Sequence, residues 1–342
     1  MSKITIFDST LRDGNHAVRH QINRQQIAEY SKRADQARIP IIVVGHGNGL
    51  GASSLHLGLS KCSDKEMLHI AKKNLKKTKL AAFVLPGFAT LKDVDMAISE
   101  GVDVFQIASH CTEATVTKQY IEYAKKKGKE VYGVLMMSHM ADKMELRYQA
   151  ETMMDYGAVG IFLMDSAGAS LPIDVQEKVG FLRNDITGTF RWNIPLGFHP
   201  HNNLGLAVSN GITAVQNQAT MIDGTTRGLG AGAGNCPLEV LVPVLHKMGY
   251  ETGIDVEKLY DCAEYIASQF PPQEITPISI TSGLSGVFSG FKPHVLKASK
   301  QFKVSPHAIF RELGKRKTVA GQEDEVIKVA KDLKTNPMEA LS

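Results

Sequence analysis

The chain has 342 residues, of which 43% are hydrophobic and 22% charged, and its formal net charge at pH 7 is +4. Single hydrophobic cores stop growing near about 250 to 300 residues, so this length allows one large domain or a barrel with a small appendage. The small net charge, and basic runs without interleaved aromatic residues, argue against nucleic-acid binding. No signal-peptide pattern and no apolar run of about 18 residues occur, so we expect neither export nor membrane insertion.

The four cysteines are scattered and form no CxxC pair and no regular framework; they are Cys62, Cys111, Cys236 and Cys262. This pattern is typical of a reducing compartment and argues against a disulfide scaffold or a cysteine zinc site. We therefore expect a cytoplasmic protein whose cysteines are buried and unpaired.

Short apolar runs rich in β-forming residues recur along most of the chain, and each is followed by a helix-like pattern such as residues 24–36. The runs are residues 4–7, 40–44, 80–85, 102–107, 130–136, 159–164, 194–198 and 220–223. Near-continuous apolar strands indicate burial on both faces, and strand–helix alternation indicates parallel crossovers. Eight such units predict an α/β fold, a closed (β/α)8 or TIM barrel, with a doubly wound open sheet as the alternative.

The last part of the chain has a different pattern. Pro237 predicts the start of the last barrel helix, because proline is favoured at the first helical position. The prolines of residues 271–277 then break the alternation, and only helix signals follow, such as the charged amphipathic pattern of residues 321–334. We therefore expect a catalytic barrel domain over residues 1–269 and a small, mainly helical region over 270–342 that binds a partner.

The segment after the first strand, residues 8–16, concentrates chemically active side chains. It places Arg12, Asp13 and His16 within a few residues, whereas an ordinary turn needs only Gly and Asp or Asn. Active sites of parallel barrels lie at the carboxyl ends of the strands, which is where this segment begins. A solvated loop is the alternative interpretation.

A second polar segment ends the seventh strand. His199 and His201 point to the same face, because side chains of a strand alternate, while Pro200 points outward. Only the eighth strand separates them from the first strand, so Asp13 can reach the same cavity. Two imidazoles and a carboxylate that leave coordination positions open suit Mn²⁺, with Mg²⁺ or Co²⁺ as alternatives, although paired histidines also occur in polar cavities without metal.

These groups together predict aldolase chemistry. A metal that binds the carboxylate and keto oxygens of a pyruvate-like 2-oxo acid stabilises its enolate, and Arg12 adds a second positive charge. His16 is placed to take the proton from a 4-hydroxyl group. Ser166, at the end of the sixth strand, can donate a hydrogen bond to a substrate oxygen. Taken singly, Arg12 could be a structural ion-pair partner and His16 a surface imidazole.

Two glycine-rich segments are less specific. Residues 228–235 can cradle an anion with backbone N–H groups, or simply pack a turn against the barrel. Residues 45–49 can shape the cavity or merely turn the chain.

Several motifs resemble those of the 4-hydroxy-2-oxovalerate aldolases, within the wider superfamily of hydroxymethylglutaryl lyases and isopropylmalate synthases. The motifs are residues 8–21, 46–50, 85–87, 165–168, 199–203 and 228–239. The resemblance implies Asp13, His199 and His201 as metal ligands, Arg12 as the group that stabilises the enolate, and His16 as the catalytic base. It also implies cleavage of 4-hydroxy-2-oxo acids to pyruvate and an aldehyde. Family members pair with an acylating aldehyde dehydrogenase that receives the aldehyde through a channel.

Three positions depart from the family pattern. Val43 stands where an acidic residue usually ends the second strand, Asn48 replaces an aspartate, and Phe288 replaces a tyrosine that reaches the active site. The metal and enolate residues are intact, so these changes concern the aldehyde half of the pocket. We expect the substrate-binding residue Phe288 to favour an aldehyde bulkier or more apolar than acetaldehyde.

Two other functions fit parts of the sequence. An acyl-CoA lyase or synthase of the same superfamily is slightly supported by Cys236, and a non-catalytic barrel subunit by Phe288 and Val43. The joint presence of Asp13, His16, His199 and His201 argues against the second. We expect small-molecule substrates, an oligomer, and neither nucleic acid nor membrane as a partner.

Overall fold

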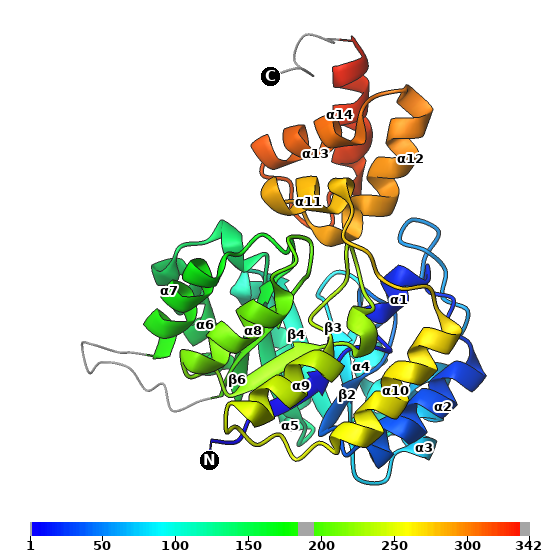
Figure 1. The fold of residues 1–342 in the computed structure, drawn as a ribbon, viewed down its shortest axis with the longest axis vertical. Coiled ribbons are helices and arrows are strands. Elements are labelled where there is room, and N and C mark those ends of the chain that lie inside the picture. Colours follow the sequence, from blue (N-terminus) through cyan, green and yellow to red (C-terminus); the bar gives the residue numbers. More distant parts are fainter. Residues whose placement is uncertain (1, 184–194, 336–342) are drawn as a thin grey trace.

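The computed structural model describes residues 2–183 and 195–335, and it forms a barrel with a group of helices beyond one end (Figure 1). Its eight parallel strands follow one another around a closed barrel in sequence order. They are β1 (Thr5–Asp8), β2 (Ile41–Val43), β3 (Lys79–Val84), β4 (Val104–His110), β5 (Glu130–Met136), β6 (Gly160–Asp165), β7 (Leu196–Pro200) and β8 (Met221–Gly224). β8 pairs with β1 and closes the ring, with Met221 opposite Thr5. The predicted barrel is confirmed, and the open sheet is wrong.

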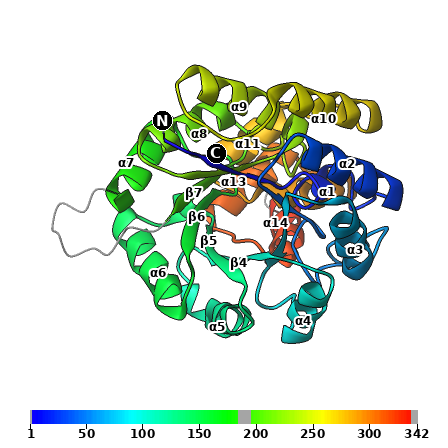
Figure 2. The same ribbon diagram turned by 90° about the horizontal axis from the view of Figure 1, so that it is seen from below.

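Helices surround the barrel, as the view along its axis shows (Figure 2). They are α1 (Gly14–Ala17), α2 (Arg24–Gln36), α3 (Asp64–Asn74), α4 (Leu91–Ser99), α5 (Lys118–Lys126), α6 (Lys143–Tyr156), α7 (Pro172–Arg183), α8 (Ala207–Gln216), α9 (Leu238–Lys247) and α10 (Val256–Gln269). α2 has its predicted bounds because Asn23 and Gln26 cap its start reciprocally, each side chain accepting the other's backbone N–H at 2.9 Å.

The start of α9 differs from the prediction. Pro237 has an extended ψ of 117°, so it caps the helix, and Leu238 is the first helical residue. A further helix, α10, follows α9 and packs beside α2. The guanidinium of Arg33 in α2 lies 5.1 Å from the ring centre of Tyr265 in α10. The predicted seventh strand began at residue 194, which lies outside the described residues, and β7 begins at Leu196.

The C-terminal region is mainly helical, as predicted, and lies over the carboxyl ends of the strands (Figure 1). Its helices are α11 (Pro277–Leu284), α12 (Lys292–Phe302), α13 (Pro306–Lys315) and α14 (Glu323–Thr335). α14 covers most of the predicted residues 321–334.

Two apolar cores hold the molecule together. An outer core fills the layer between the strands and the surrounding helices. The second, which we call the inner core, runs without a break from the barrel interior to the C-terminal helices; it includes Phe7, Val43, Tyr132, Phe162, Phe288, Phe291, Val295, Phe310, Leu313 and Val326. Within the barrel, the ring of Phe7 meets those of Tyr132 and Phe162 edge to face at 5.2 and 4.8 Å. The helical region is thus packed onto the barrel rather than tethered to it.

Two other expectations concern the whole chain. The four cysteines are buried and unpaired, as predicted. Within residues 2–183 and 195–335, none of the helices combines the length and the apolar character needed to cross a membrane.

We predict that Gly197→Ala destabilises the barrel. A Cβ at this buried position in β7 lies 2.4 Å from the ring of Phe162, so the inner core must shift to make room, at a cost of about 1–3 kcal/mol. The matched control is Gly211→Ala in α8, where the nearest atom is a Leu241 methyl carbon at 3.4 Å. Urea unfolding of both variants tests this, and equal midpoints would show that the close approach to Phe162 is harmless.

Candidate metal centre and active site

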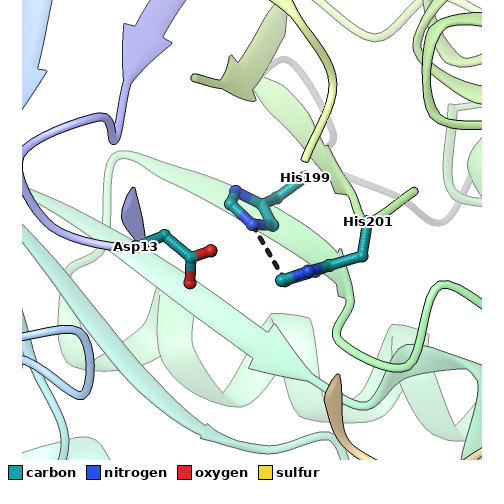
Figure 3. Close-up of side chains that lie close together, drawn as sticks. All are labelled: Asp13, His199 and His201. Carbon is teal, nitrogen blue, oxygen red and sulfur yellow. Dashed lines mark hydrogen bonds between the residues drawn. The ribbon is translucent and has the colours of Figure 1, made fainter. Parts of the chain in front are cut away.

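Three buried side chains converge at the carboxyl ends of β1 and β7 (Figure 3). Asp13 lies in the turn after β1, at the start of α1, and His199 and His201 come from the end of β7. Their potential ligand atoms all lie within 4.8 Å of one another, and the two Nε2 atoms are 3.3 Å apart. The structure therefore brings together the three ligands that the sequence predicts.

The turn that carries Asp13 is anchored beneath by Asp8, the last residue of β1. Asp8 Oδ1 accepts the N–H of Thr10 at 2.9 Å, and Asp8 Oδ2 accepts the hydroxyl of Tyr30, from α2, at 2.5 Å. Burial raises the pKa of Asp8 to about 6, although these hydrogen bonds counteract it. This buried network fixes where the chain leaves the barrel and enters the site.

The carboxylate of Asp13 is held from both sides. Its Oδ1 accepts a hydrogen bond from Arg12 Nη1 at 2.8 Å, while its Oδ2 accepts from the backbone N–H of Ala231 at 3.2 Å and from Asn235 Nδ2 at 2.6 Å. Ala231 and Asn235 belong to the glycine-rich residues 228–235. The anion that this loop contacts in the structure is the protein's own carboxylate.

Burial and nearby charges set the protonation states of Asp13, His201 and His16. Burial alone would raise the pKa of Asp13, but the Arg12 guanidinium and the nearby imidazoles outweigh it and hold that pKa well below its usual range. Burial lowers the pKa of His201 to about 3 and also lowers the pKa of His16. An ionised carboxylate beside neutral imidazoles is the protonation state that metal ligands need.

One residue that contacts His199, Asp223, was not predicted from the sequence. The carboxylate of Asp223, at the end of β8, lies 3.3 Å from His199 Nδ1 and accepts a hydrogen bond from Gln106 Nε2 at 3.1 Å. Burial would raise the pKa of Asp223, but His199 lowers it below the ordinary value. The signal was present, because Asp223 is a charged residue at the carboxyl end of a predicted strand.

The donor set fits a divalent cation. One carboxylate and two imidazoles with open positions suit an ion such as Mn²⁺. Asn235 offers an oxygen as a possible fourth ligand, because its Oδ1 is buried without a hydrogen-bond partner while its Nδ2 donates to Asp13. Buried polar atoms normally find partners, so this oxygen is available to a ligand or ion.

A small cavity opens onto these residues and contains most of the other predicted side chains. It is lined by Arg12, Asp13, His16, Gly47, Asn48, Phe83, Leu85, Met136, Met164, His201 and Phe288. The Arg12 guanidinium lies 4.6 Å from the ring centre of Phe83. A Cβ on Gly47 would lie 2.5 Å from His16 Nε2, so glycine at this position lets the loop after β2 approach the imidazole. The segment 45–49 thus shapes the cavity.

The apolar lining was missed in the sequence. Phe83 and Leu85 come from β3 and its end, and Met136 and Met164 from the ends of β5 and β6. Alternation along the strands, applied to apolar as well as polar residues, would have found them.

Other predicted residues lie outside the cavity lining. Ser166 is buried, and its hydroxyl oxygen accepts the N–H of Met137 at 3.0 Å, so its contact with substrate stays a prediction. Val43 is buried in the inner core, so its effect on the aldehyde pocket is indirect. Burial raises the pKa of the Cys236 thiol well above its ordinary value, so this side chain is not an available nucleophile.

Comparison with known proteins places the chain in a family of barrel enzymes. The HMGL-like family model matches residues 3–266, and the model described as DmpG-like communication domain matches residues 273–335. A protein from Pectobacterium atrosepticum named 4-hydroxy-2-oxovalerate aldolase is 51% identical over 97% of this chain and 96% of its own length. One of the same name from Spirochaeta aurantia is 48% identical over the same shares. The carboxyl transferase domain of Rhizobium etli pyruvate carboxylase shares the fold, with a TM-score of 0.83 at 15% identity over 98% of this chain and 61% of that one.

The fold and the site thus define a member of the HMGL-like barrel family, a metal-dependent family. Within it, the chain belongs with the 4-hydroxy-2-oxovalerate aldolases, which confirms the resemblance in its motifs.

We predict that His199→Ala and Asp13→Ala each weaken Mn²⁺ binding by more than about 100-fold, since changing even an outer partner of a metal ligand costs 10–100-fold. Titration followed by electron paramagnetic resonance measures the affinity. The controls are His69→Ala and Asp95→Ala, which remove residues with side chains exposed by 67% and 48%. Wild-type affinity in the Asp13 or His199 variant would rule out this metal site.

Proposed function

We propose that this protein is a divalent-metal-dependent aldolase that cleaves or forms 4-hydroxy-2-oxo acids from pyruvate, or a close 2-oxo acid, and an aldehyde. The observation that carries the proposal is one cavity that holds the Asp13 carboxylate, His201, Arg12 and His16 together. The names of its relatives from Pectobacterium and Spirochaeta agree with this activity. Release of pyruvate from 4-hydroxy-2-oxovalerate in the presence of Mn²⁺ tests it directly.

The residues divide the reaction between two halves of the cavity. In cleavage, His16 takes the proton of the 4-hydroxyl group, the C3–C4 bond breaks, and C4 becomes the aldehyde carbonyl carbon. The electrons of that bond pass to the 2-oxo acid as its enolate, and Arg12 stabilises the negative charge that develops. A divalent ion at Asp13, His199 and His201 supplies further positive charge beside the keto oxygen when bound.

We take Mn²⁺ as the native ion, with Mg²⁺ and Co²⁺ as alternatives. A carboxylate with two imidazoles leaves open positions for oxygen ligands from the substrate, which suits the octahedral preference of Mn²⁺. Affinity measured with each ion, together with activity, distinguishes them.

We assign the aldehyde half of the site to Phe288 and Asn48. Both line the small cavity and also a larger neighbouring cavity between residues 48–58 and the helices α12 and α14. The ring of Phe288 offers no hydroxyl, so this half is more apolar than the family pattern implies. An aldehyde with a larger apolar group can bury it there.

We propose that residues 270–342 bind an acylating aldehyde dehydrogenase. The match of residues 273–335 to the communication domain supports this partner, and the larger cavity beside Phe288 gives a route toward the helical region. Buried, unpaired cysteines support a cytoplasmic location. The acyl-CoA alternative is not favoured, since Cys236 is buried and the close relatives carry the aldolase name.

We predict that His16→Ala retains Mn²⁺ affinity but lowers the rate of aldol cleavage by about 10²–10⁴-fold, the usual contribution of general acid–base catalysis. Exchange of the pyruvate methyl protons survives if another group performs it. Lactate-dehydrogenase-coupled assays and proton NMR measure the two reactions. An unchanged cleavage rate would remove His16 from the role of base.

We predict that the wild-type protein prefers aldehydes bulkier than acetaldehyde, and that Phe288→Tyr shifts this preference toward small aldehydes. A hydroxyl that donates to an oxygen gaining charge contributes about 1.5–3 kcal/mol, which matters most where little apolar surface is buried. The measurement is kcat/KM for acetaldehyde and benzaldehyde in both proteins. A wild type that favours acetaldehyde, with no shift in the variant, would show that Phe288 does not set specificity.

A further inference from the structure

The segment that carries Phe288, residues 286–292, is hydrogen-bonded to loops that follow four different barrel strands. His139, after β5, lies with Nε2 2.9 Å from the carbonyl oxygen of Gly286. The N–H of Ser289 donates to the carbonyl oxygen of Ser166, after β6, at 2.9 Å. Lys292 Nζ donates at 3.0 Å to the carbonyl oxygen of Gly232, after β8. The fourth loop, after β7, contributes Asn203.

Asn203 is the centre of this arrangement, because its side chain is buried and hydrogen-bonded at every polar atom. Its Oδ1 accepts the N–H of Ala233 at 2.8 Å, and its Nδ2 donates to the carbonyl oxygen of Ala167 at 2.8 Å and to Ser289 Oγ at 2.9 Å. A Cβ on Gly232 would lie 2.5 Å from Asn203 Oδ1 and 3.0 Å from Ser289 Cβ, so only glycine fits at position 232 beside this hydrogen bond. One amide thus joins three barrel loops to the helical region.

Two of those loops also contribute to the candidate metal centre. Asn203 follows His201 by two residues, and Ala233 lies between Ala231 and Asn235, which both contact Asp13. On the other side, Ser289 adjoins Phe288, whose ring lines the cavity and meets Phe291 of the inner core edge to face at 5.6 Å. The contact between Asn203 and Ser289 is therefore a short side-chain link from the metal loops to the aldehyde side of the cavity.

We propose that the Asn203–Ser289 hydrogen bond positions the Phe288 ring over the cavity, so that these two residues determine aldehyde specificity without touching the substrate. The proposal rests on the proposed aldolase function. Apolar packing against Phe291 keeps the ring buried, whereas directional hydrogen bonds fix the backbone from which it projects. Loss of the bond widens the aldehyde half and leaves the metal half in place.

The test uses Ser289→Ala in the full-length, Mn²⁺-loaded protein, with Ser299→Ala as the matched control. Ser299 is also in the helical region, and its hydroxyl donates at 2.7 Å to the carbonyl oxygen of Val304, so this bond lies within that region. Three quantities are measured: the ratio of kcat/KM for benzaldehyde to that for acetaldehyde, the exchange rate of pyruvate methyl protons, and deuterium uptake of the peptide containing residues 286–291.

For Ser289→Ala we expect the kcat/KM ratio to fall about fivefold to tenfold through a higher KM for benzaldehyde. Proton exchange should change less than twofold, deuterium uptake at 286–291 should rise, and the remaining peptides should be unaffected. Asn203→Ala also removes the bonds to Ala167 and Ala233, so the double variant is compared with both single variants: the two effects on the ratio should be less than additive, because both substitutions remove the same Asn203–Ser289 bond. Ser299→Ala should match the wild type in all three measurements.

An unchanged ratio in Ser289→Ala, or a fall in proton exchange as large as the fall in the ratio, overturns the proposal. A wild type that neither cleaves hydroxy acids nor exchanges pyruvate protons contradicts the proposed function instead. In that case deuterium uptake still tests the positioning role, and equal uptake in Ser289→Ala and wild type rejects it.

Discussion

The site depends on one constraint, a carboxylate that stays ionised while it is buried. An isolated charge in a protein interior is costly, so Asp13 must be surrounded by groups that favour its anionic form. The guanidinium of Arg12, the N–H of Ala231 and the amide of Asn235 supply them. Three strands therefore have to meet at the same end of the barrel: β1 brings Asp13, β7 brings the imidazoles, and the loop after β8 brings the N–H donors.

The barrel and the convergence of the three candidate metal ligands were predictable because both follow from periodic rules. Strand–helix alternation repeated eight times leaves few architectures, and alternation within β7 places His199 and His201 on one face. The family motifs then named the same residues. The helical C-terminal region was also evident, because the prolines of residues 271–277 interrupt the strand pattern and only helix signals follow.

The parts of the site that the sequence did not predict depend on contacts between residues far apart in the chain. The carboxylate of Asp223 approaches His199 only because β7 and β8 are neighbours in the closed ring, and no local pattern shows that Gln106 reaches it from the opposite side. The sequence also did not predict which group the loop 228–235 contacts, since a glycine-rich pattern does not distinguish a loop that binds a ligand from one that binds Asp13. The prediction that α9 starts at Pro237 was wrong by one residue, because the φ of proline suits both an N-cap and a first helical residue.

Because the inner core spans both parts, the helical region cannot be exchanged between relatives independently of the barrel. Members of this one core fill the barrel interior, line part of the cavity and build the centre of the helical region. A chimaera that took its C-terminal helices from a relative would bring a foreign counterpart of Phe288 and Phe291 into a cavity shaped by other loops. A single crossover between α9 and α10 would divide the inner core between two parents, so a chimaera that keeps this core intact must take its barrel strands and its C-terminal helices from the same parent.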